Sequence, residues 1–392
     1  MKILRIHNRY IETGGEDEVV RSDTQMLRDK GHEVIIYERS NQEINRFSIS
    51  RRLTFFLKDI IWSNDSYKQV KKLAREAKPD IAHIDNIFLM ITPSVYDALK
   101  ELKIPILQSL CSYRLICPKG MFYRDKQVCE LCREGDYSPA VRYRCLRSSL
   151  MASLLWARML KAHYRNKTFF TKPDAFITLS DFSKEIFVKW GIDRKKIFVK
   201  PVAVAEQPRL NHTQEDYALY IGRFVDYKGV KTLVSAFEKL PEYNLKLIGD
   251  GPLYPEIKEK ARRMKNIELL GSLSSQEKFD YIRRSRFVIF PSECFETFGI
   301  VMLEAYSCRV SVIGSDLGTR KELVKNMQTG LLFRPADVND LAAKISWAFE
   351  HPQKMREFGE KGRDLHSSSY SPDKNYQLLI DIYREILKDK PA

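Results

Sequence analysis

The chain has 392 residues, more than a single hydrophobic core usually supports, and this length predicts two domains. With 44% hydrophobic and 30% charged residues, the composition is that of a globular protein, and no run approaches the roughly 18 to 20 apolar residues of a membrane-spanning helix. The formal charge of +15 favours partners such as nucleic acid, anionic lipid or phosphorylated small molecules. The first fifteen residues lack the apolar core and cleavage site of a secretory signal, so the cytoplasm is the expected location.

Short apolar strands alternate with helices in the first half of the chain. The first strand, residues 2–7, leads through a glycine-rich turn into a helix that stops at Gly31, and a second strand follows at 32–38. The strand pattern returns at 79–84, 104–110 and 173–180, with a helix at 93–102. This alternation predicts a parallel sheet with helices on both faces.

The periodic pattern breaks in a proline-containing polar stretch at 195–216, and the alternation restarts at 217–224. Strands are predicted at 243–249, 266–271, 287–290 and 330–333, with helices between them at 231–240, 252–264 and 275–285. Residues 371–389 have helical spacing and a capping sequence at their start. We therefore predict an α/β chain of two Rossmann-like domains, 1–203 and 204–371, followed by a C-terminal helix at 372–392.

Two carboxylates stand eight residues apart in the segment PSECFETFGIVMLEAYSC, residues 291–308. Glu296 falls in the loop after the strand at 287–290, and Glu304 falls on a helix that begins near Gly299. Open α/β sheets bind ligands at this edge, where a helix N-terminus suits a phosphate and a carboxylate suits sugar hydroxyls. This arrangement favours a nucleotide-sugar pocket, although a single Glu is more commonly a solvated surface residue.

These residues resemble the E-x7-E element of retaining glycosyltransferases of the GT-B fold, in glycosyltransferase family four. Four further motifs agree in order: GGEDEVV at 14–20, YIGRFVDYKG at 220–229, LIGDGP at 247–252 and GSDLGTRKE at 314–322. The resemblance covers nearly the whole chain and is most specific over 217–334. It implies two Rossmann-like domains facing a central cleft, with the C-terminal helix crossing back to the first domain.

The resemblance also assigns roles. Glu304 would bind the ribose, and Glu296 with the amides of Phe298 and Gly299 would hold the transferred sugar. Arg223 and Lys228 would neutralise the diphosphate leaving group without a metal, and the chain contains no Asp-x-Asp triplet. The expected catalytic residues are therefore Glu296, Arg223 and Lys228, and the remaining expected donor-binding positions are Gly14, Gly15, Gly222, Gly249 and Ile300.

The chain departs from the family in three places, one of them VKPVAVAE at 199–206, which removes no expected site residue. Cys111 stands where relatives commonly have a His near the reacting sugar, and His83, at the end of a predicted strand, is the candidate to reach the same cleft. These two residues are the expected acceptor-side positions, although a His at a strand end is more often structural. In the late loop, Arg320 replaces a smaller residue, and we expect it to offer a further phosphate or carboxylate contact.

Four cysteines, Cys117, Cys129, Cys132 and Cys145, lie in or beside an expected insertion at about 111–146, with the spacing C-x11-C-x2-C-x12-C. Four thiolates can hold a structural zinc ion, which would order such a loop. The alternative is four free thiols in a reducing compartment. No cofactor is expected for catalysis.

Residues 137–173 contain no Asp or Glu but eight Lys and Arg side chains. Within them Leu150, Met151, Leu154, Leu155, Met159 and Leu160 follow helical spacing, and residues 46–62 also mix aromatic and basic side chains. Such surfaces favour peripheral contact with an anionic membrane, or else pack on the first sheet.

The function predicted is a cytoplasmic, metal-independent retaining glycosyltransferase at the inner face of the plasma membrane. It would move a sugar from a nucleotide diphosphate donor to a glycan or lipid-linked glycan in polysaccharide assembly. A basic nucleic-acid-binding protein and a GT-B epimerase or phosphorylase remain as alternatives. The motifs at 217–334 have no purpose in a nucleic-acid-binding protein, so nucleic acid is not the expected partner.

Overall fold

The computed structural model describes residues 1–11, 14–209 and 214–388, which form two compact units. The first unit comprises residues 1–121, 130–201 and the chain from Tyr376 onward, and the second comprises 122–129 and 202–375. The expected boundary at 203/204 lies two residues beyond this division. The segment Phe122–Cys129, which falls inside the expected insertion of the first domain, groups with the second unit instead.

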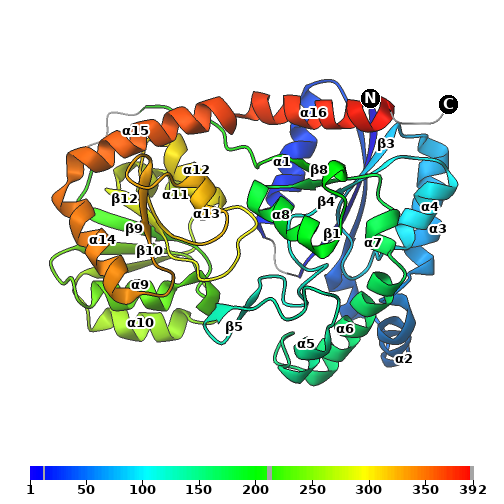
Figure 1. The fold of residues 1–392 in the computed structure, drawn as a ribbon, viewed down its shortest axis with the longest axis horizontal. Coiled ribbons are helices and arrows are strands. Elements are labelled where there is room, and N and C mark those ends of the chain that lie inside the picture. Colours follow the sequence, from blue (N-terminus) through cyan, green and yellow to red (C-terminus); the bar gives the residue numbers. More distant parts are fainter. Residues whose placement is uncertain (12–13, 210–213, 389–392) are drawn as a thin grey trace. The chain divides into compact units, whose positions relative to one another are not determined.

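The first unit is built on a six-stranded sheet with the order β2-β1-β3-β4-β7-β8 (Figure 1). All neighbouring strands are parallel. The strands are β1 (Lys2–Arg9), β2 (Glu33–Ser40), β3 (Ile81–Asn86), β4 (Ile106–Ser109), β7 (Ala175–Thr178) and β8 (Ile197–Val199). Its helices are α1 (Gly15–Asp29), α2 (Ile49–Thr54), α3 (Asn64–Ala77), α4 (Ser94–Glu101), α5 (Ser138–Arg142), α6 (Leu150–Arg165), α7 (Thr168–Thr171) and α8 (Asp181–Trp190).

The last helix, α16 (Pro372–Lys388), adds its apolar face to the core of the first unit. Leu379 and Tyr383 are completely buried there, in one cluster with Ile3 of β1, Ile81 of β3 and Ile177 of β7. The helix predicted at the C-terminus thus groups with the first unit from Tyr376 onward, and burial of these side chains stabilises it in that position.

The second unit repeats the architecture with the strand order β11-β10-β9-β12-β13-β14, again all parallel. The strands are β9 (Tyr217–Ile221), β10 (Asn244–Ile248), β11 (Ile267–Gly271), β12 (Phe287–Phe290), β13 (Val312–Ser315) and β14 (Gly330–Phe333). The helices are α9 (Val230–Phe237), α10 (Tyr254–Arg262), α11 (Ser275–Arg284), α12 (Ile300–Ser307), α13 (Arg320–Leu323), α14 (Val338–Glu350) and α15 (Pro352–Ser369). The predicted doubly wound α/β class is therefore confirmed in both units.

A short antiparallel hairpin, β5 (Tyr123–Arg124) with β6 (Gln127–Val128), belongs to the second unit although the chain reaches it from the first. The ring of Phe122 packs on that of Phe295 with 5.8 Å between the ring centroids, and the ring of Tyr123 packs on that of Tyr227 with 6.2 Å between the centroids. These aromatic contacts hold the hairpin against the loops that follow β9 and β12.

Candidate functional site

The candidate site of the second unit lies at the carboxyl ends of its parallel strands. Because β9, β12 and β13 run the same way, the loops that leave them reach the same edge of the sheet. Arg223 and Lys228 follow β9, and Glu296 follows β12. The fold therefore brings together three residues predicted from two separate motifs.

Glu296 and Lys228 form an ion pair, with 2.6 Å between Glu296 Oε1 and Lys228 Nζ. Burial by itself would raise the pKa of Glu296, but the charges of Lys228 and Arg320 outweigh burial and hold that pKa below its ordinary value. In the same way, burial would lower the pKa of Lys228, and the Glu296 carboxylate raises it instead. Both groups are charged at neutral pH, so a cation stands at the sheet edge. Arg223 is exposed in the same loop.

Arg320 and Thr319 hold the loop that carries Glu296. Thr319 Oγ1 donates to the carbonyl oxygen of Glu296 at 2.9 Å. Arg320 is completely buried, and its guanidinium donates to the carbonyl oxygens of Cys294 at 2.9 Å and Ser315 at 3.2 Å. The prediction that Arg320 contacts a ligand is therefore wrong: its side chain supports the loop backbone from beneath and adds positive charge near Glu296.

Glu293 is a member of this edge that the sequence motifs did not single out. It is 7% exposed, and its carboxylate accepts hydrogen bonds from Thr232 Oγ1 at 2.5 Å and from the Tyr123 hydroxyl at 3.1 Å. Its backbone N–H donates to the carbonyl oxygen of Tyr227 at 2.9 Å. Glu293 thus ties the β5–β6 hairpin and the loop after β9 to the loop after β12. The sequence offered one sign of this role: Glu293 stands only three residues before Glu296, in the same loop after β12.

Glu304 lies in the second turn of α12 and is 7% exposed. Its Oε1 accepts a hydrogen bond from Lys278 Nζ of α11 at 2.5 Å. Its Oε2 is buried and has no hydrogen-bond partner among the described residues. A buried acceptor without a donor costs about 1 to 3 kcal/mol, so such an atom is suited to accept from a ligand hydroxyl. Lys278 was not predicted from the sequence.

The predicted glycines have a structural reason as well. Gly249 has φ +140, and a Cβ there would lie 2.0 Å from the carbonyl oxygen of Gly222, so the loops after β9 and β10 approach too closely for any side chain. Gly299 precedes α12 with φ +134. The first backbone N–H groups of α12, those of Ile300 and Val301, are at the start of the helix, where amides have no intrahelical acceptor. The side chain of Phe298 is buried, with its ring 6.0 Å from that of Tyr370.

In the first unit, Gly14 and Gly15 stand at the start of α1, and the neighbouring Glu12 and Thr13 lie outside the described residues. The N–H of Gly14 donates to Asp17 Oδ2 at 2.8 Å, and Asp17 Oδ1 lies 2.8 Å from His7 Nε2. A Cβ on Gly14 would meet no described atom within 4 Å. Packing of the described residues therefore does not require glycine at this position.

A group of ionisable side chains lies near Gly14 and was not predicted. Arg5 and Asp85 form a buried ion pair, with 2.6 Å between Nη2 and Oδ1. Burial, followed by the nearby charge of Asp85, raises the pKa of Glu16 to about 8, against an opposing effect of Arg114. Glu16 can therefore change its charge near neutral pH.

His83 and Cys111 were expected on the acceptor side, and the structure gives His83 a different role. His83 is 1% exposed, with Nδ1 2.7 Å from the Tyr383 hydroxyl and Nε2 2.7 Å from Ser109 Oγ. Burial lowers its pKa to about 4, so the ring is neutral and joins β3 to β4 and α16. Burial, with the nearby carboxylates of Glu16 and Asp85, raises the pKa of the half-buried Cys111 thiol well above its ordinary value.

Of the four cysteines of the zinc prediction, Cys132 is buried and Cys117, Cys129 and Cys145 are half-buried. Cys129 groups with the second unit, and Cys117, Cys132 and Cys145 group with the first. Across the described part of the chain, no three or more His, Cys, Asp or Glu side chains are arranged to hold a metal ion. The geometry gives the zinc site no support, and it stays a prediction. None of the helices within 1–11, 14–209 and 214–388 has the length and apolar character to cross a membrane.

Comparison with known proteins finds a match to a family model within the second unit. Residues 205–365 match the model of the family described as glycosyl transferases group 1. The chain is 29% identical over 236 residues to an uncharacterised glycosyltransferase of Methanocaldococcus jannaschii, covering 60% of this chain and 66% of that protein. It is 26% identical over 217 residues to the O-antigen chain mannosyltransferase C of Escherichia coli, covering 53% and 56%. The chain thus spans less than two thirds of the length of each of these relatives.

The fold extends over the whole chain. The crystal structure of HepE from Anabaena in complex with UDP covers 98% of this chain and 100% of its own, with a TM-score of 0.68 and 15% identity. At that identity the likeness is one of fold. Together with the two parallel sheets, it confirms the predicted GT-B class.

Proposed function

We propose, from the premise that residues 205–365 belong to the glycosyl transferases group 1 family, that this protein transfers a sugar from a nucleotide diphosphate donor to a glycan acceptor. The observation that carries the proposal is Glu304, whose buried Oε2 lacks a donor at the edge where open α/β sheets bind ligands. A ribose hydroxyl would supply that hydrogen bond. The UDP bound by HepE and the O-antigen mannosyltransferase among the relatives support a nucleotide-sugar donor and a polysaccharide product.

The test is calorimetric titration of the protein with UDP and with GDP. We expect one of the two to bind, and Glu304→Gln to weaken that binding about 10- to 100-fold, because the amide cannot serve both Lys278 and the ribose as the carboxylate does. Glu242→Gln, an exposed change in the same unit, is the matched control and should bind as the unchanged protein does. Binding of neither nucleotide by the folded protein would contradict the proposal.

The charges of Lys228 and Arg223 would stabilise the departing nucleotide diphosphate, and this is the basis for proposing a metal-independent reaction. The ion pair to Glu296 orients Lys228, and Thr319 and Arg320 fix the loop on which Glu296 stands. Because these side chains would already be oriented toward the diphosphate, they would need little rearrangement as the bond between the sugar and the diphosphate breaks. Retention of anomeric configuration, implied by the family resemblance, completes this proposal.

Removal of divalent metal should therefore leave the reaction intact. We expect the initial rate of sugar transfer in excess EDTA to stay within about twofold of the rate with added Mg²⁺, because the side chains supply the cations. The measurement is product formation from a radiolabelled donor. Loss of transfer in EDTA that returns on adding Mg²⁺ or Mn²⁺ would show that a metal is required.

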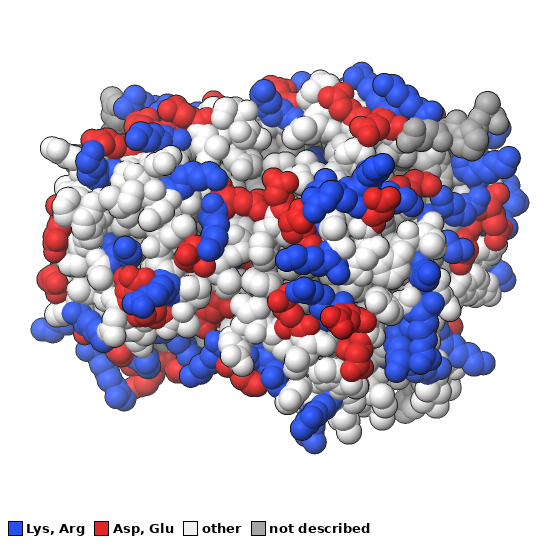
Figure 2. Space-filling model, in the orientation of Figure 1, with Lys and Arg blue, Asp and Glu red and all other residues white. Residues whose placement is uncertain are grey.

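The acceptor is proposed to be lipid-linked and reached at the inner face of the plasma membrane. The surface that supports this lies on α2 and α6 of the first unit. Arg158 Nη1 of α6 donates a hydrogen bond of 3.1 Å to the carbonyl oxygen of Leu57, in the π-helical segment Phe55–Asp59 that follows α2. Ile49 and Leu53 of α2 are 88% and 62% exposed. Figure 2 shows Lys and Arg side chains beside uncharged surface over these helices. Exposed apolar side chains among cations suit an anionic bilayer.

The apolar side chains predicted along α6 divide between the two expected roles, membrane contact and packing in the core of the first unit. Leu150, Met151 and Leu154 are exposed, whereas Met159 and Leu160 are buried in the first unit. The first half of α6 is thus available to a membrane and the second half belongs to the core.

Replacing Leu53 and Met151 together by serine should reduce retention on vesicles of phosphatidylglycerol and phosphatidylcholine at least about tenfold, since each buried apolar side chain contributes about 1.5 to 3 kcal/mol. Flotation measures the bound fraction, and Met327→Ser, at an exposed site of the second unit, is the control. Equal retention of both variants would rule out this surface as the membrane contact.

A further inference from the structure

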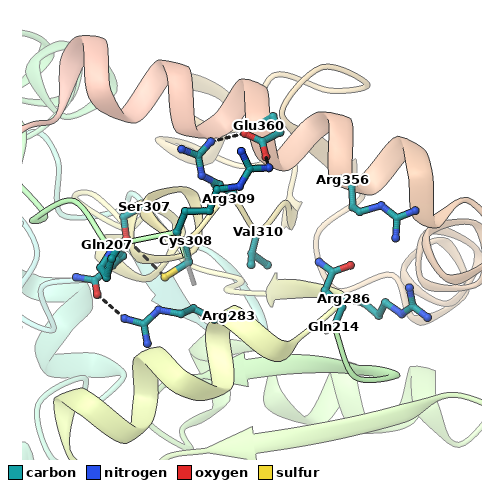
Figure 3. A pocket seen from close by; sticks show the side chains of 12 residues that line it. Gln207, Gln214, Arg283, Arg286, Ser307, Cys308, Arg309, Val310, Arg356 and Glu360 are labelled. Carbon is teal, nitrogen blue, oxygen red and sulfur yellow. Dashed lines mark hydrogen bonds and ion pairs between the residues drawn. The ribbon is translucent and has the colours of Figure 1, made fainter. Parts of the chain in front are cut away.

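A cavity of about 450 Å³ opens in the second unit away from the site described above (Figure 3). It is bounded by segments that precede three strands: Gln214 comes before β9, Arg286 immediately before β12, and Val310 before β13. Since these strands are parallel, the cavity lies at their amino ends, the opposite edge of the sheet from the loop of Glu296. The donor-binding residues take no part in it.

The lining is strongly cationic. It contains five arginines and one acidic residue: Arg209, Arg283, Arg286, Arg309, Arg356 and Glu360. Glu360 is shared, because Arg309 pairs with its Oε2 and Arg209 Nη2 lies 3.5 Å from its Oε1. Figure 3 shows the side chains of Arg283, Arg286, Arg309 and Arg356 arranged around Val310.

The neighbouring carboxylates do not balance these charges. Arg283 Nη1 lies 2.6 Å from Asp280, and Arg286 Nε lies 3.1 Å from Asp216. With Glu360, three carboxylates face five guanidinium groups, which leaves a charge of +2. Among the described residues, Arg356 has no carboxylate within 4 Å.

One of the arginines is held in place from within the protein. The side chain of Arg283 is only 8% exposed, and its Nη2 donates to Gln207 Oε1 at 2.8 Å. Its Nε is buried and has no hydrogen-bond partner in the described structure. A fixed guanidinium with an unused donor is a preorganised contact for an anion, because little side-chain freedom remains to be lost on binding.

The end of α12 beside the cavity does not account for the arginines. The carbonyl oxygen of Ser307 accepts from Arg363 Nη1 at 2.6 Å, and Arg363 is not part of the lining. Cys308 and Val310 both donate their backbone N–H groups to Ala305. The carbonyl groups of Ala305 and Ser307 at the C-terminal end of α12 therefore already have donors without the five lining arginines.

We propose that this cavity is a second anion site, which binds a freely diffusing small molecule carrying phosphate groups with at least two negative charges. A guanidinium group can donate two parallel hydrogen bonds to the oxygens of one phosphate. A cavity of this volume is large enough for a sugar phosphate or a nucleotide. The lining has no large exposed apolar side chain, which favours a soluble ligand over a lipid in a bilayer. The ligand is distinct from the donor, and the site does not depend on the proposed function.

Pyrophosphate is the probe, titrated by calorimetry at physiological ionic strength. We expect binding to this cavity to survive in the Lys228→Met protein, in which the donor edge has lost one of its two cations and keeps Arg223. In that background Arg356→Gln should weaken pyrophosphate binding at least tenfold, and Arg283→Gln should do the same. Arg356 is exposed and has no ion-pair partner among the described residues, so its replacement tests binding without threatening the fold.

Arg262→Gln is the matched control, since it removes one exposed arginine of the second unit outside the cavity. If it weakens binding as much as Arg356→Gln, the affinity reflects overall charge and the proposal is overturned. Absence of pyrophosphate binding in the Lys228→Met protein overturns it too. Retention on phosphatidic acid vesicles that requires Arg356, without binding of soluble pyrophosphate, would identify a lipid headgroup as ligand and overturn the soluble ligand proposed. UDP binding by Arg356→Gln should be unchanged, which separates this site from the donor site.

Discussion

Replacing Lys228 with methionine is expected to lower kcat of sugar transfer by about 100- to 1000-fold. Methionine keeps most of the length of the side chain but removes the charge that lies 2.6 Å from Glu296. Two effects combine. The leaving diphosphate loses a preorganised cation as its negative charge develops. Glu296 becomes a half-buried carboxylate that has lost its ion pair with Lys228, and because Lys228 is the main influence that lowers its pKa, that pKa rises.

The measurement is single-turnover transfer from the nucleotide sugar identified by calorimetry. Lys231→Met is the matched control, since Lys231 is on the next turn and pairs with Glu256 at the surface, 2.8 Å away. We expect the control to remain within about twofold, as exposed ion pairs contribute little. The affinity for the nucleotide should fall far less than kcat, because the cation acts mainly on the transition state. A Lys228→Met rate within threefold of the unchanged protein would show that Lys228 is not catalytic.

Gly249→Ala is expected to destabilise the second unit by about 3 kcal/mol or more. The added methyl would stand 2.0 Å from the carbonyl oxygen of Gly222, at φ +140. Both the backbone conformation and the contact are unfavourable for any residue with a Cβ, and neither loop can retreat without breaking the hydrogen bond of 3.0 Å from Gly222 N to the Ile248 carbonyl oxygen.

Gly271→Ala separates these two causes. Gly271 ends β11 with φ +69, but a Cβ there meets no described atom within 4 Å. We expect its replacement to cost about 1 kcal/mol, the effect of left-handed backbone alone. Urea denaturation followed by intrinsic fluorescence measures both variants. If the two variants lose equal stability, the close approach of the loops after β9 and β10 is not the reason that residue 249 must lack a Cβ.

Much of the fold follows from local patterns. The strand and helix alternation, the two parallel sheets and the start of α12 next to Gly299 were predicted from apolar periodicity and glycine positions, because these depend on residues close in the chain. Glu296 was predicted at one sheet edge for a related reason: in a parallel sheet every carboxyl end faces the same way. Arg223 and Lys228 were assigned to the same site by the family resemblance.

The errors and omissions concern side chains whose partners lie far away in the sequence. His83 was expected near the acceptor, but Tyr383, three hundred residues later, takes up its Nδ1 and buries it. Arg320 was expected to contact a ligand, but it is enclosed beneath the loop of Cys294. Lys278 and Tyr123 gave no signal, because nothing near them in the chain identifies Glu304 or Glu293 as their partner.

The sequence by itself determined the fold class, the sheet edge that carries the candidate site and the chemical types of its side chains. Only the tertiary structure decided which carboxylate oxygen stays without a donor, which arginine supports a loop and which ones line an open cavity. Local pattern encodes the conformation of the backbone, since strand and helix depend on near neighbours. Burial and pairing of a side chain depend on what distant segments bring against it, and those decide whether its charge serves the fold or a ligand.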